Sequence, residues 1–341
     1  MTTTAPVRHY CTLFDRTYLI KGLAMYQSLE QHAGDFRLFI LCMDDLAYDV
    51  LDQLKLRHAE LIRLSAFENA DLLAVKADRS VAEYCWTCAP CLPAYLLERH
   101  PGIDFITYLD ADLLFFSSPE PVYSEIGGAS SVIVEHRFAP LFQPSIVNGK
   151  YNVQWVSFRR DVHGLETLHW WRDKCIEWCY YRLEDDRMGD QKYLDCWTER
   201  FQGVHELQHV GAGTGPWNFS NYRIQDRDQQ VWVDDVPLVF YHFHGYRMLE
   251  NGRSVAMPSV YTDDTPVPRM IYDRYDKALL QSLATIRQVD PDFSYGIETS
   301  AREGFGALPS ARAAGESLPA PFKKLLRKIT PRFIRNRPPR I

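Results

Sequence analysis

Two aspartates one residue apart interrupt the most apolar stretch of the chain. Asp110 and Asp112 lie within residues 105–116, FITYLDADLLFF, which otherwise favours a buried strand. Side chains at i and i+2 of a strand point to the same side, so these carboxylates would repel each other unless a cation or proton compensates. A hard divalent cation accepts oxygen ligands and leaves positions for phosphate oxygens. The spacing indicates a metal–diphosphate site at the strand end, although this common pattern alone is more often a pair of capping or solvated residues.

Strands and helices alternate in the part of the chain that leads to this pair. Periodicity predicts strands over 7–14, 36–43, 60–65 and 105–116, separated by helices over 18–32, 46–58 and about 80–98. Asp44-Asp45 can cap the helix at 46–58, and Pro90 and Pro93 are expected at breaks or starts of the third helical region. The alternation predicts an α/β fold with a mainly parallel, doubly wound sheet, whose ligands bind at the carboxyl ends of the strands.

The second half of the chain completes the predicted domain. Strands are predicted over 130–138 and 151–160, with helices over 165–184 and from 189 to 201, and residues 231–246 are expected to close the sheet region. From about residue 300 the composition shifts to Gly, Ala, Ser, Pro and Arg, which is typical of a linker. We therefore expect a catalytic domain at 1–250, a helical extension at 251–300, and a flexible linker with a basic tail at 301–341.

Charge is distributed unevenly over the 341 residues. The formal net charge is −6, yet residues 319–341 hold eight Lys or Arg and no Asp or Glu. The acidic body excludes a basic nucleic-acid-binding face. In the tail Phe322, Leu325, Leu326 and Ile329 follow helical spacing between basic residues, which fits either attachment to an anionic membrane surface or a disordered solvated segment.

Targeting signals and cysteines indicate the compartment. No apolar run approaches the roughly 18–20 residues of a membrane span, and the N-terminus lacks the apolar core of a signal peptide. We therefore expect a cytoplasmic protein, peripheral to the membrane if the tail binds it, with eight reduced cysteines. Cys85, Cys88 and Cys91 have a spacing that could hold zinc or an iron–sulfur cluster, but on a helix it more often places three thiols on one packed face.

Five short motifs follow one another in a specific order. They are CTLFDRTYL (11–19), YLDADLLFF (108–116), YNVQW (151–155), GDQKYLD (189–195) and YHFHGY (241–246). In this order they resemble retaining glycosyltransferases of the GT-A fold, the family-8 type that includes glycogenin and bacterial lipopolysaccharide galactosyl- and glucosyltransferases. The resemblance covers residues 7–246. It implies a Rossmann-like GT-A fold and transfer of a sugar, with retention, from a nucleotide diphosphate sugar, expected to be a UDP-sugar, to a glycan or glycolipid acceptor of the cell envelope.

The resemblance also implies roles for individual residues. A Mn²⁺ or Mg²⁺ ion would be held by Asp110, Asp112 and His242, with His244 a rival for the histidine position. Asp190 and Gln191 would face the transferred sugar and its acceptor, although Asp190 could also be a helix cap. Contacts to the donor are implied for Thr12, Phe14, Asp15, Tyr18, Tyr108, Ala111, Asn152, Gly245 and Arg247.

Two departures from the family pattern leave alternatives open. Gln154 stands where the family has the glycine of an N-x-G segment, and Met248 stands where it has a lysine. Arg247 is adjacent to Met248, and we expect its guanidinium to reach the diphosphate as a fork. A non-catalytic nucleotide or sugar binder on the same fold is one alternative. A HAD-type phosphatase, which also uses a strand-end Asp-x-Asp, is another, although Leu114 and the late position of the motif disfavour it.

Overall fold

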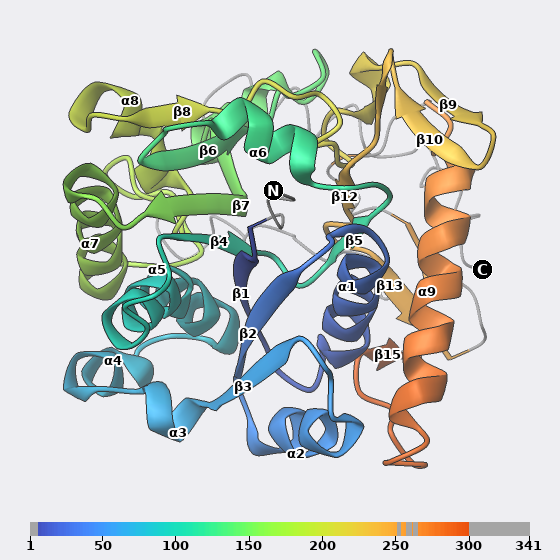
Figure 1. The fold of residues 1–341 in the computed structure, drawn as a ribbon, viewed down its shortest axis with the longest axis horizontal. Helices are drawn as coiled ribbons and strands as arrows, with labels where there is room; N and C mark the ends of the chain where they lie inside the picture. The colour runs from blue at the N-terminus through green and yellow to red at the C-terminus, as the bar shows by residue number, and fades with distance from the viewer. Residues whose placement is uncertain (1–5, 251–253, 257–260, 262–264, 300–341) are drawn as a thin grey trace, which may run out of the picture. The chain divides into compact units, whose positions relative to one another are not determined.

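A computed structural model describes residues 6–250, 254–256, 261 and 265–299. Its centre is a seven-stranded sheet with the order β3-β2-β1-β4-β7-β6-β8 (Figure 1). The strands are β1 (Arg8–Phe14), β2 (Phe36–Cys42), β3 (Ala59–Arg63), β4 (Phe105–Leu109), β6 (Ser131–Glu135), β7 (Tyr151–Arg159) and β8 (Val204–Glu206). Neighbours in this sheet are parallel, except that β7 runs antiparallel to β4 and β6. The predicted α/β class with a mainly parallel sheet is confirmed.

Helices pack on both faces of this sheet. They are α1 (Leu19–His32), α2 (Asp45–Leu54), α3 (Leu64–Phe67), α4 (Ala70–Lys76), α5 (Val81–Arg99), α6 (Glu120–Ile126), α7 (Val162–Glu177), α8 (Trp197–Arg200) and α9 (Arg269–Ile286), with 3-10 helices η1 (Gln143–Asn148), η2 (Lys192–Cys196) and η3 (Phe219–Asn221). Alternation along β1 divides the core. Tyr10 and Phe14 join a cluster with α1, α2, α6 and α9, whereas Cys11 and Leu13 join another with α4, α5 and α7. Burial of both faces explains the nearly unbroken apolar run of β2.

The parallel register brings the carboxyl ends of the central strands together. Phe14 at the end of β1 lies opposite Cys42 at the end of β2, and β4 pairs with β1 on the other side. Acidic residues follow each of these ends, namely Asp15, Asp44 and Asp110. Asp44 caps α2 as predicted, because its Oδ1 accepts the Ala47 N–H at 2.9 Å.

Three smaller sheets accompany the central one. β5 (Leu113–Phe115) pairs with β12 (Phe240–His242), and β9 (Ile224–Arg227), β10 (Gln230–Val233) and β11 (Val236–Pro237) form the second; the third contains β13 (Arg247–Leu249), β14 (Ser254–Val255) and β15 (Ile297–Glu298). Residues 231–246, which were expected to close the sheet region, hold β10, β11 and β12 and belong to these smaller sheets. The left-handed conformation of Asp234, with φ of 53°, makes a turn there, and Pro237 cannot donate to a ladder.

The prediction of a single strand over 105–116 is wrong. β4 ends at Leu109, and the Asp110 N–H donates to the Gln154 carbonyl at 3.1 Å as the chain leaves the ladder with β7. After the turn, β5 leaves the central sheet and pairs with β12 instead. The two aspartates therefore lie in a connection between two strands, and their proximity does not come from strand alternation.

Two helix predictions need correction. Pro90 and Pro93 lie inside α5 and not at its ends. Each removes a backbone donor, but α5 packs against α7 and the sheet, and we attribute its continuity to this burial. The helix predicted over 165–184 ends at Glu177, because Trp178 is extended with φ of −155° and ψ of 122°.

The C-terminal part of the described chain joins the same compact unit. α9 lies beside α1, and its apolar face, including Tyr275 and Leu279, is part of the core cluster on that face of the sheet (Figure 1). The division into domains at residue 250 stays a prediction, and the linker and basic tail at 301–341 lie outside the described residues. Among the helices of the described ranges, none has the length and apolarity that a bilayer crossing requires.

Candidate metal and donor site

Strand pairing places His242 beside the aspartate turn. In the antiparallel pair of β5 and β12, His242 lies opposite Leu113, the residue that follows Asp112. The backbone closes this arrangement, because the Phe243 N–H donates to the Asp112 carbonyl and the His242 N–H donates to the Thr214 carbonyl, both at 3.0 Å. Residues more than a hundred positions apart are thus held together by backbone hydrogen bonds.

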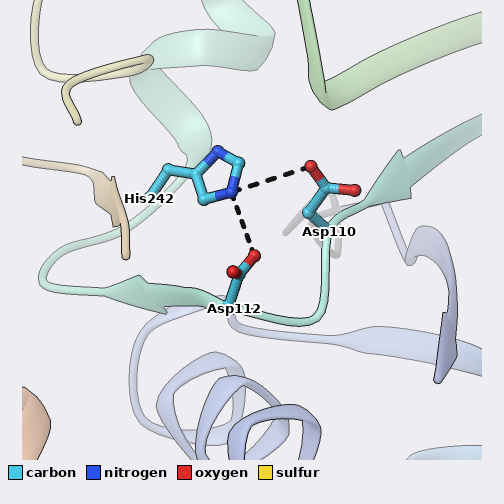
Figure 2. Close-up of side chains that lie close together, drawn as sticks. All are labelled: Asp110, Asp112 and His242. Carbon is cyan, nitrogen blue, oxygen red and sulfur yellow. Dashed lines mark ion pairs between the residues drawn. The ribbon is translucent and has the colours of Figure 1, made fainter. Parts of the chain in front are cut away.

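The side chains of Asp110, Asp112 and His242 converge (Figure 2). The Nε2 atom of His242 is 3.0 Å from Asp112 Oδ1 and 3.9 Å from Asp110 Oδ2. One potential ligand atom from each residue lies within 4.8 Å of the others, and the structure shows no second such cluster of His, Cys, Asp or Glu among its described residues. His244 is exposed and is not part of this group, although its ring centroid is 5.7 Å from that of His242. We call these three residues the acidic triad.

The electrostatics of the acidic triad are those of a site built for positive charge. Burial raises the pKa of Asp110 to about 6, an effect that His242 opposes and Asp112 reinforces. Burial acts in the same direction on Asp112, but the nearby imidazole lowers the pKa of Asp112 below its usual range. Burial disfavours charged His242, yet Asp112 and Asp110 raise the pKa of His242. The two carboxylates thus favour a cation beside them.

The donor set fits a divalent ion. Two carboxylates and an imidazole are ligands that Mn²⁺ and related ions accept in proteins. Asp112 and His242 are 5% and 3% exposed, whereas Asp110 is partly exposed, so the triad is open on the Asp110 side. The buried Nδ1 atom of His242 has no hydrogen-bond partner among the residues that the structure describes. The described residues therefore use only part of the hydrogen-bonding and ligand capacity of the acidic triad.

Asp190 and Gln191 lie in the segment that precedes η2. Asp190 is 7% exposed; burial first, and then the charge of Asp110, raise the pKa of Asp190 to about 8. The Asp190 backbone is fixed, because Trp171 Nε1 donates to its carbonyl at 2.9 Å. Gln191 Nε2 donates to the Asn148 carbonyl at 2.9 Å. The Asp190 carboxyl is thus within the electrostatic influence of Asp110, whereas the Gln191 amide is engaged with the neighbouring loop.

Asn152 lies on the same edge of the sheet, and both ends of its side-chain amide are hydrogen-bonded within the protein. Its Nδ2 donates to His136 Nε2 at 2.9 Å and its Oδ1 accepts the Gln154 N–H at 2.8 Å. His136 completes the arrangement by donating from Nδ1 to the Lys150 carbonyl at 3.1 Å. One Nδ2 hydrogen and one Oδ1 lone pair of Asn152 are not used by these bonds, and the sugar contact predicted for it stays a prediction.

The predicted nucleotide contacts divide by exposure. Thr12 and Phe14 are 0% and 3% exposed, and Phe14 fills the space that a side chain at Gly22 would need, so only their backbone could meet a ligand. Asp15 Oδ1 accepts the Thr17 N–H at 2.9 Å and shapes the turn before α1. Tyr18 is 40% exposed, so a base could reach its ring.

The other predicted donor contacts lie around this edge. Tyr108 and Ala111 are buried before and within the aspartate turn, and Gly245 uses φ of 71° three residues after His242. Arg247 on β13 forms an ion pair with Glu298 on β15 at 3.2 Å. The Arg247 guanidinium is thus already paired with a carboxylate, whereas the sequence predicted that it would contact the diphosphate.

Sequence reasoning missed Lys21. It lies in the first turn of α1, where its ammonium is 4.2 Å from the centroid of the Tyr18 ring. Burial lowers the pKa of Lys21, against the influence of Asp112 and Glu298, so the amine lies within the field of the acidic triad. No hydrogen bond or ion pair joins Lys21 to the rest of the described chain. Helical periodicity gives no signal for such a residue, because the position of the Lys21 ammonium relative to the site depends on where α1 packs.

The cysteines contribute to no cluster of three potential metal ligands among the described residues. All eight are free, and Cys88 and Cys91 are buried in the core beside α7. The Cys91 thiol donates to the Thr87 carbonyl at 3.2 Å, as a packed helical cysteine does.

Comparison with known proteins gives a fold and a family. No protein-family model matches the chain. Among solved structures, galactosyltransferase LgtC, in complex with donor and acceptor sugar analogues, is 13% identical, with a TM-score of 0.50 over 80% of this chain and 95% of LgtC. At this identity the likeness concerns the fold, and the GT-A prediction is confirmed at that level.

Closer relatives come from Bacillus subtilis (strain 168). The uncharacterized protein YfnD is 32% identical over 291 residues, which cover 84% of this chain and 94% of YfnD. The uncharacterized protein YfnF is 31% identical over 293 residues, which cover 84% and 96%. The chain therefore belongs to the protein family of YfnD and YfnF.

Proposed function

We propose that this protein is a metal-dependent glycosyltransferase that moves a sugar from a nucleotide diphosphate sugar, expected to be a UDP-sugar, to a glycan or glycolipid. The observation that carries the proposal is the acidic triad at the carboxyl edge of a GT-A sheet. Ligands of open α/β sheets bind at this edge. Two carboxylates held together there, one of them partly exposed, favour a cation that also binds a diphosphate.

Asp110, Asp112 and His242 would hold Mn²⁺ or Mg²⁺. Such an ion, when bound, acts as a Lewis acid toward the charge that develops on a leaving diphosphate. Lys21 would add a second positive charge to the diphosphate from the start of α1. It takes the part that the sequence assigned to Arg247, which is occupied with Glu298. Tyr18 would lie against the nucleotide.

Asp190 would contact the sugar that is transferred. Its carboxyl is close enough to Asp110 to share the same field, and its backbone is fixed by Trp171. A fixed polar group there orients a sugar hydroxyl, and correct orientation of the two substrates accounts for a large part of such rate enhancements. Retention of configuration belongs to the proposal through the family resemblance.

The acceptor and location follow from the same proposal. A cell-envelope glycan or glycolipid would be met at the cytoplasmic face of the membrane. Attachment through residues 319–341 would bring the enzyme to it, if this segment binds anionic lipid.

The two alternatives make different demands on the acidic triad. A HAD-type phosphatase would use the first aspartate as a nucleophile, and the GT-A fold disfavours that reading. A non-catalytic binder would retain nucleotide affinity without turnover. The acidic triad is open, and its hydrogen-bonding capacity is only partly used. We therefore favour an active enzyme over a non-catalytic binder.

Turnover of nucleotide sugars tests the proposal. The protein would be incubated with Mn²⁺ and each of a set of UDP- and GDP-sugars, and the released nucleoside diphosphate would be measured, with and without a mixture of cell-envelope glycans. We expect release from one donor and a loss of at least about 100-fold in Asp110→Asn. Asp45→Asn, which changes an exposed aspartate on α2, is the matched control. Nucleotide binding without release from any donor would support the binder, and release of phosphate from a phosphomonoester would support the phosphatase.

A further inference from the structure

The segment between α7 and Asp190 is irregular but firmly held. Residues 178–188, WCYYRLEDDRM, form what we call the aromatic loop. At its start, the Arg79 guanidinium donates to the carbonyls of Cys179 and Ile176 at 2.7 and 2.9 Å. At its end, the Gly189 N–H donates to the Tyr180 carbonyl at 3.0 Å. The start of the loop is therefore anchored to the folded body, and its end is tied back to its start.

The N-terminus of α5 fixes the middle of the aromatic loop. Glu83 closes a capping box with Ser80 through one carboxylate oxygen and accepts the Tyr181 N–H at 2.7 Å through the other. Glu184 and Arg187 exchange backbone hydrogen bonds at 3.0 and 2.8 Å. A segment with these constraints presents its side chains in a fixed geometry.

The side chain presented in this way is an exposed aromatic ring. Tyr181 is 45% exposed, and its ring centroid is 5.6 Å from that of the partly buried Trp86. Trp86 also covers Gly189: a Cβ at that glycine would be 3.4 Å from Trp86 Cε3. Because Gly189 directly precedes Asp190, the ring pair borders the predicted reaction centre.

Aromatic rings also lie beside the acidic triad. The Tyr261 ring is 6.1 Å from Trp217, and Trp217 is 5.2 Å from His242. Burial first, and then the Tyr181 phenol, raise the pKa of Tyr261 to about 12.

The chemistry of the loop favours a neutral, flat ligand. Its arginines already face aromatic rings, since Arg182 lies 4.6 Å from the centroid of Tyr180 and Arg187 lies 4.8 Å from that of Trp178. They are therefore poorly placed to bind an anion. A pyranose ring has apolar C–H faces that pack on an aromatic face and hydroxyl edges that reach a carboxyl group such as that of Asp190.

We propose that Trp86 and Tyr181 form a platform on which a pyranose ring of the acceptor stacks, with a hydroxyl directed to Asp190. This inference rests on the proposed function and names the part of the acceptor that the protein recognises. The exposed Leu183, on the same loop, would extend the platform toward the next sugar of a longer acceptor.

Saturation-transfer NMR tests the platform without knowledge of the natural acceptor. The probes are methyl pyranosides of glucose, galactose and N-acetylglucosamine, added to the full chain with UDP and Mn²⁺. We expect transfer to C–H protons of at least one pyranoside in the wild-type protein and in Tyr181→Phe, which keeps the ring. In Tyr181→Ala the affinity should fall about tenfold. Tyr48→Ala, which removes a ring from α2 that packs under Arg63, should bind as the wild type does.

Each result decides the inference. Equal pyranoside binding by Tyr181→Ala and the wild type overturns it, and so does the absence of transfer to every pyranoside in the wild type. Titration of UDP into the same variants separates this inference from the proposed function. If Tyr181→Ala loses the pyranoside but keeps UDP, the platform is supported. If no variant or wild type binds UDP, yet a pyranoside binds through Tyr181, the platform stands and the donor assignment fails.

Discussion

Two polar clusters occupy the same edge of the central sheet and differ in how their atoms are satisfied. Around His136, both ring nitrogens and both ends of the Asn152 amide have partners within the protein. In the acidic triad, by contrast, two carboxylates share one imidazole, whose second nitrogen is buried without a partner in the described part of the chain. Similar residue types at one edge thus serve two purposes.

The difference separates structure from function on physical grounds. A buried polar group that keeps all its hydrogen bonds stabilises its surroundings, because no desolvation cost is left uncompensated. A cluster of like charges with unused capacity costs stability and is retained only where a ligand completes it. We therefore expect substitutions around His136 to lower the free energy of unfolding, and substitutions in the acidic triad to weaken ligand binding.

Removing the imidazole of His136 should have the largest effect on folding. His136→Ala leaves the Asn152 amide and the Lys150 carbonyl without their partner and opens a cavity, so the free energy of unfolding should fall by about 2–4 kcal/mol. Chemical denaturation measures this. His163→Ala, near the start of α7, is the control and should stay within about 0.5 kcal/mol. Equal stability of both variants would show that the cluster does not support the fold.

Loss of Lys21 should affect binding and not folding. We expect Lys21→Gln to bind UDP about tenfold more weakly while UMP affinity changes little, because the ammonium would face the outer phosphate. Calorimetry with both nucleotides in Mn²⁺ measures the ratio. Lys76→Gln, which removes a cation of α4 that is paired with Glu68, is the control. Unchanged UDP affinity in Lys21→Gln would remove Lys21 from the donor site.

The state of His136 predicts an acid limit to stability. Burial lowers the pKa of His136 from its ordinary 6.5 to about 3, reinforced by His244 and His242 and opposed by its bond to the Lys150 carbonyl. The unfolded chain then binds a proton that the folded chain rejects. This contribution is therefore fully present above pH 6.5 and is lost as pH falls from there toward 3, by up to about 1.4 kcal/mol per pH unit. Denaturation across this window should give a shallower pH dependence in His136→Gln, and an identical one would contradict this assignment.

In the acidic triad, we expect a substitution to change the free energy of unfolding in the direction opposite to that of His136→Ala. Without metal, Asp110→Asn should leave the free energy of unfolding unchanged or raise it by up to about 1 kcal/mol, since it relieves repulsion with Asp112 and Asp190. Added Mn²⁺ should raise the melting temperature of the wild type but not of this variant. A marked destabilisation of metal-free Asp110→Asn would show that the triad is a structural cluster after all.

The sequence predicted the elements whose burial leaves a regular pattern. β1, β2 and β7 are close to their predicted ranges, because both faces of each pack against apolar layers. The prediction of one strand over 105–116 failed because apolar residues continue on both sides of a turn. Only the pairing of β5 with β12 reveals that turn. α5 misled for the reverse reason: its prolines signal a break that tertiary packing overrides.

The candidate site was partly visible in the same way. Asp110, Asp112 and His242 were grouped from motifs, and the fold places them together. Lys21 and Tyr181 carry no motif. One depends on where α1 packs, and the other on a loop anchored by Arg79 and Glu83. Features that arise from packing between distant segments leave no trace in local periodicity.

Titration of UDP into the purified protein, with and without Mn²⁺, tests the central claim most directly. It would be repeated with Asp112→Asn, which keeps the shape of the side chain and removes its charge. The account predicts binding that requires Mn²⁺ in the wild type and is lost in the variant. Equal binding with and without Mn²⁺, or binding that survives in Asp112→Asn, would contradict a metal–diphosphate site at the acidic triad.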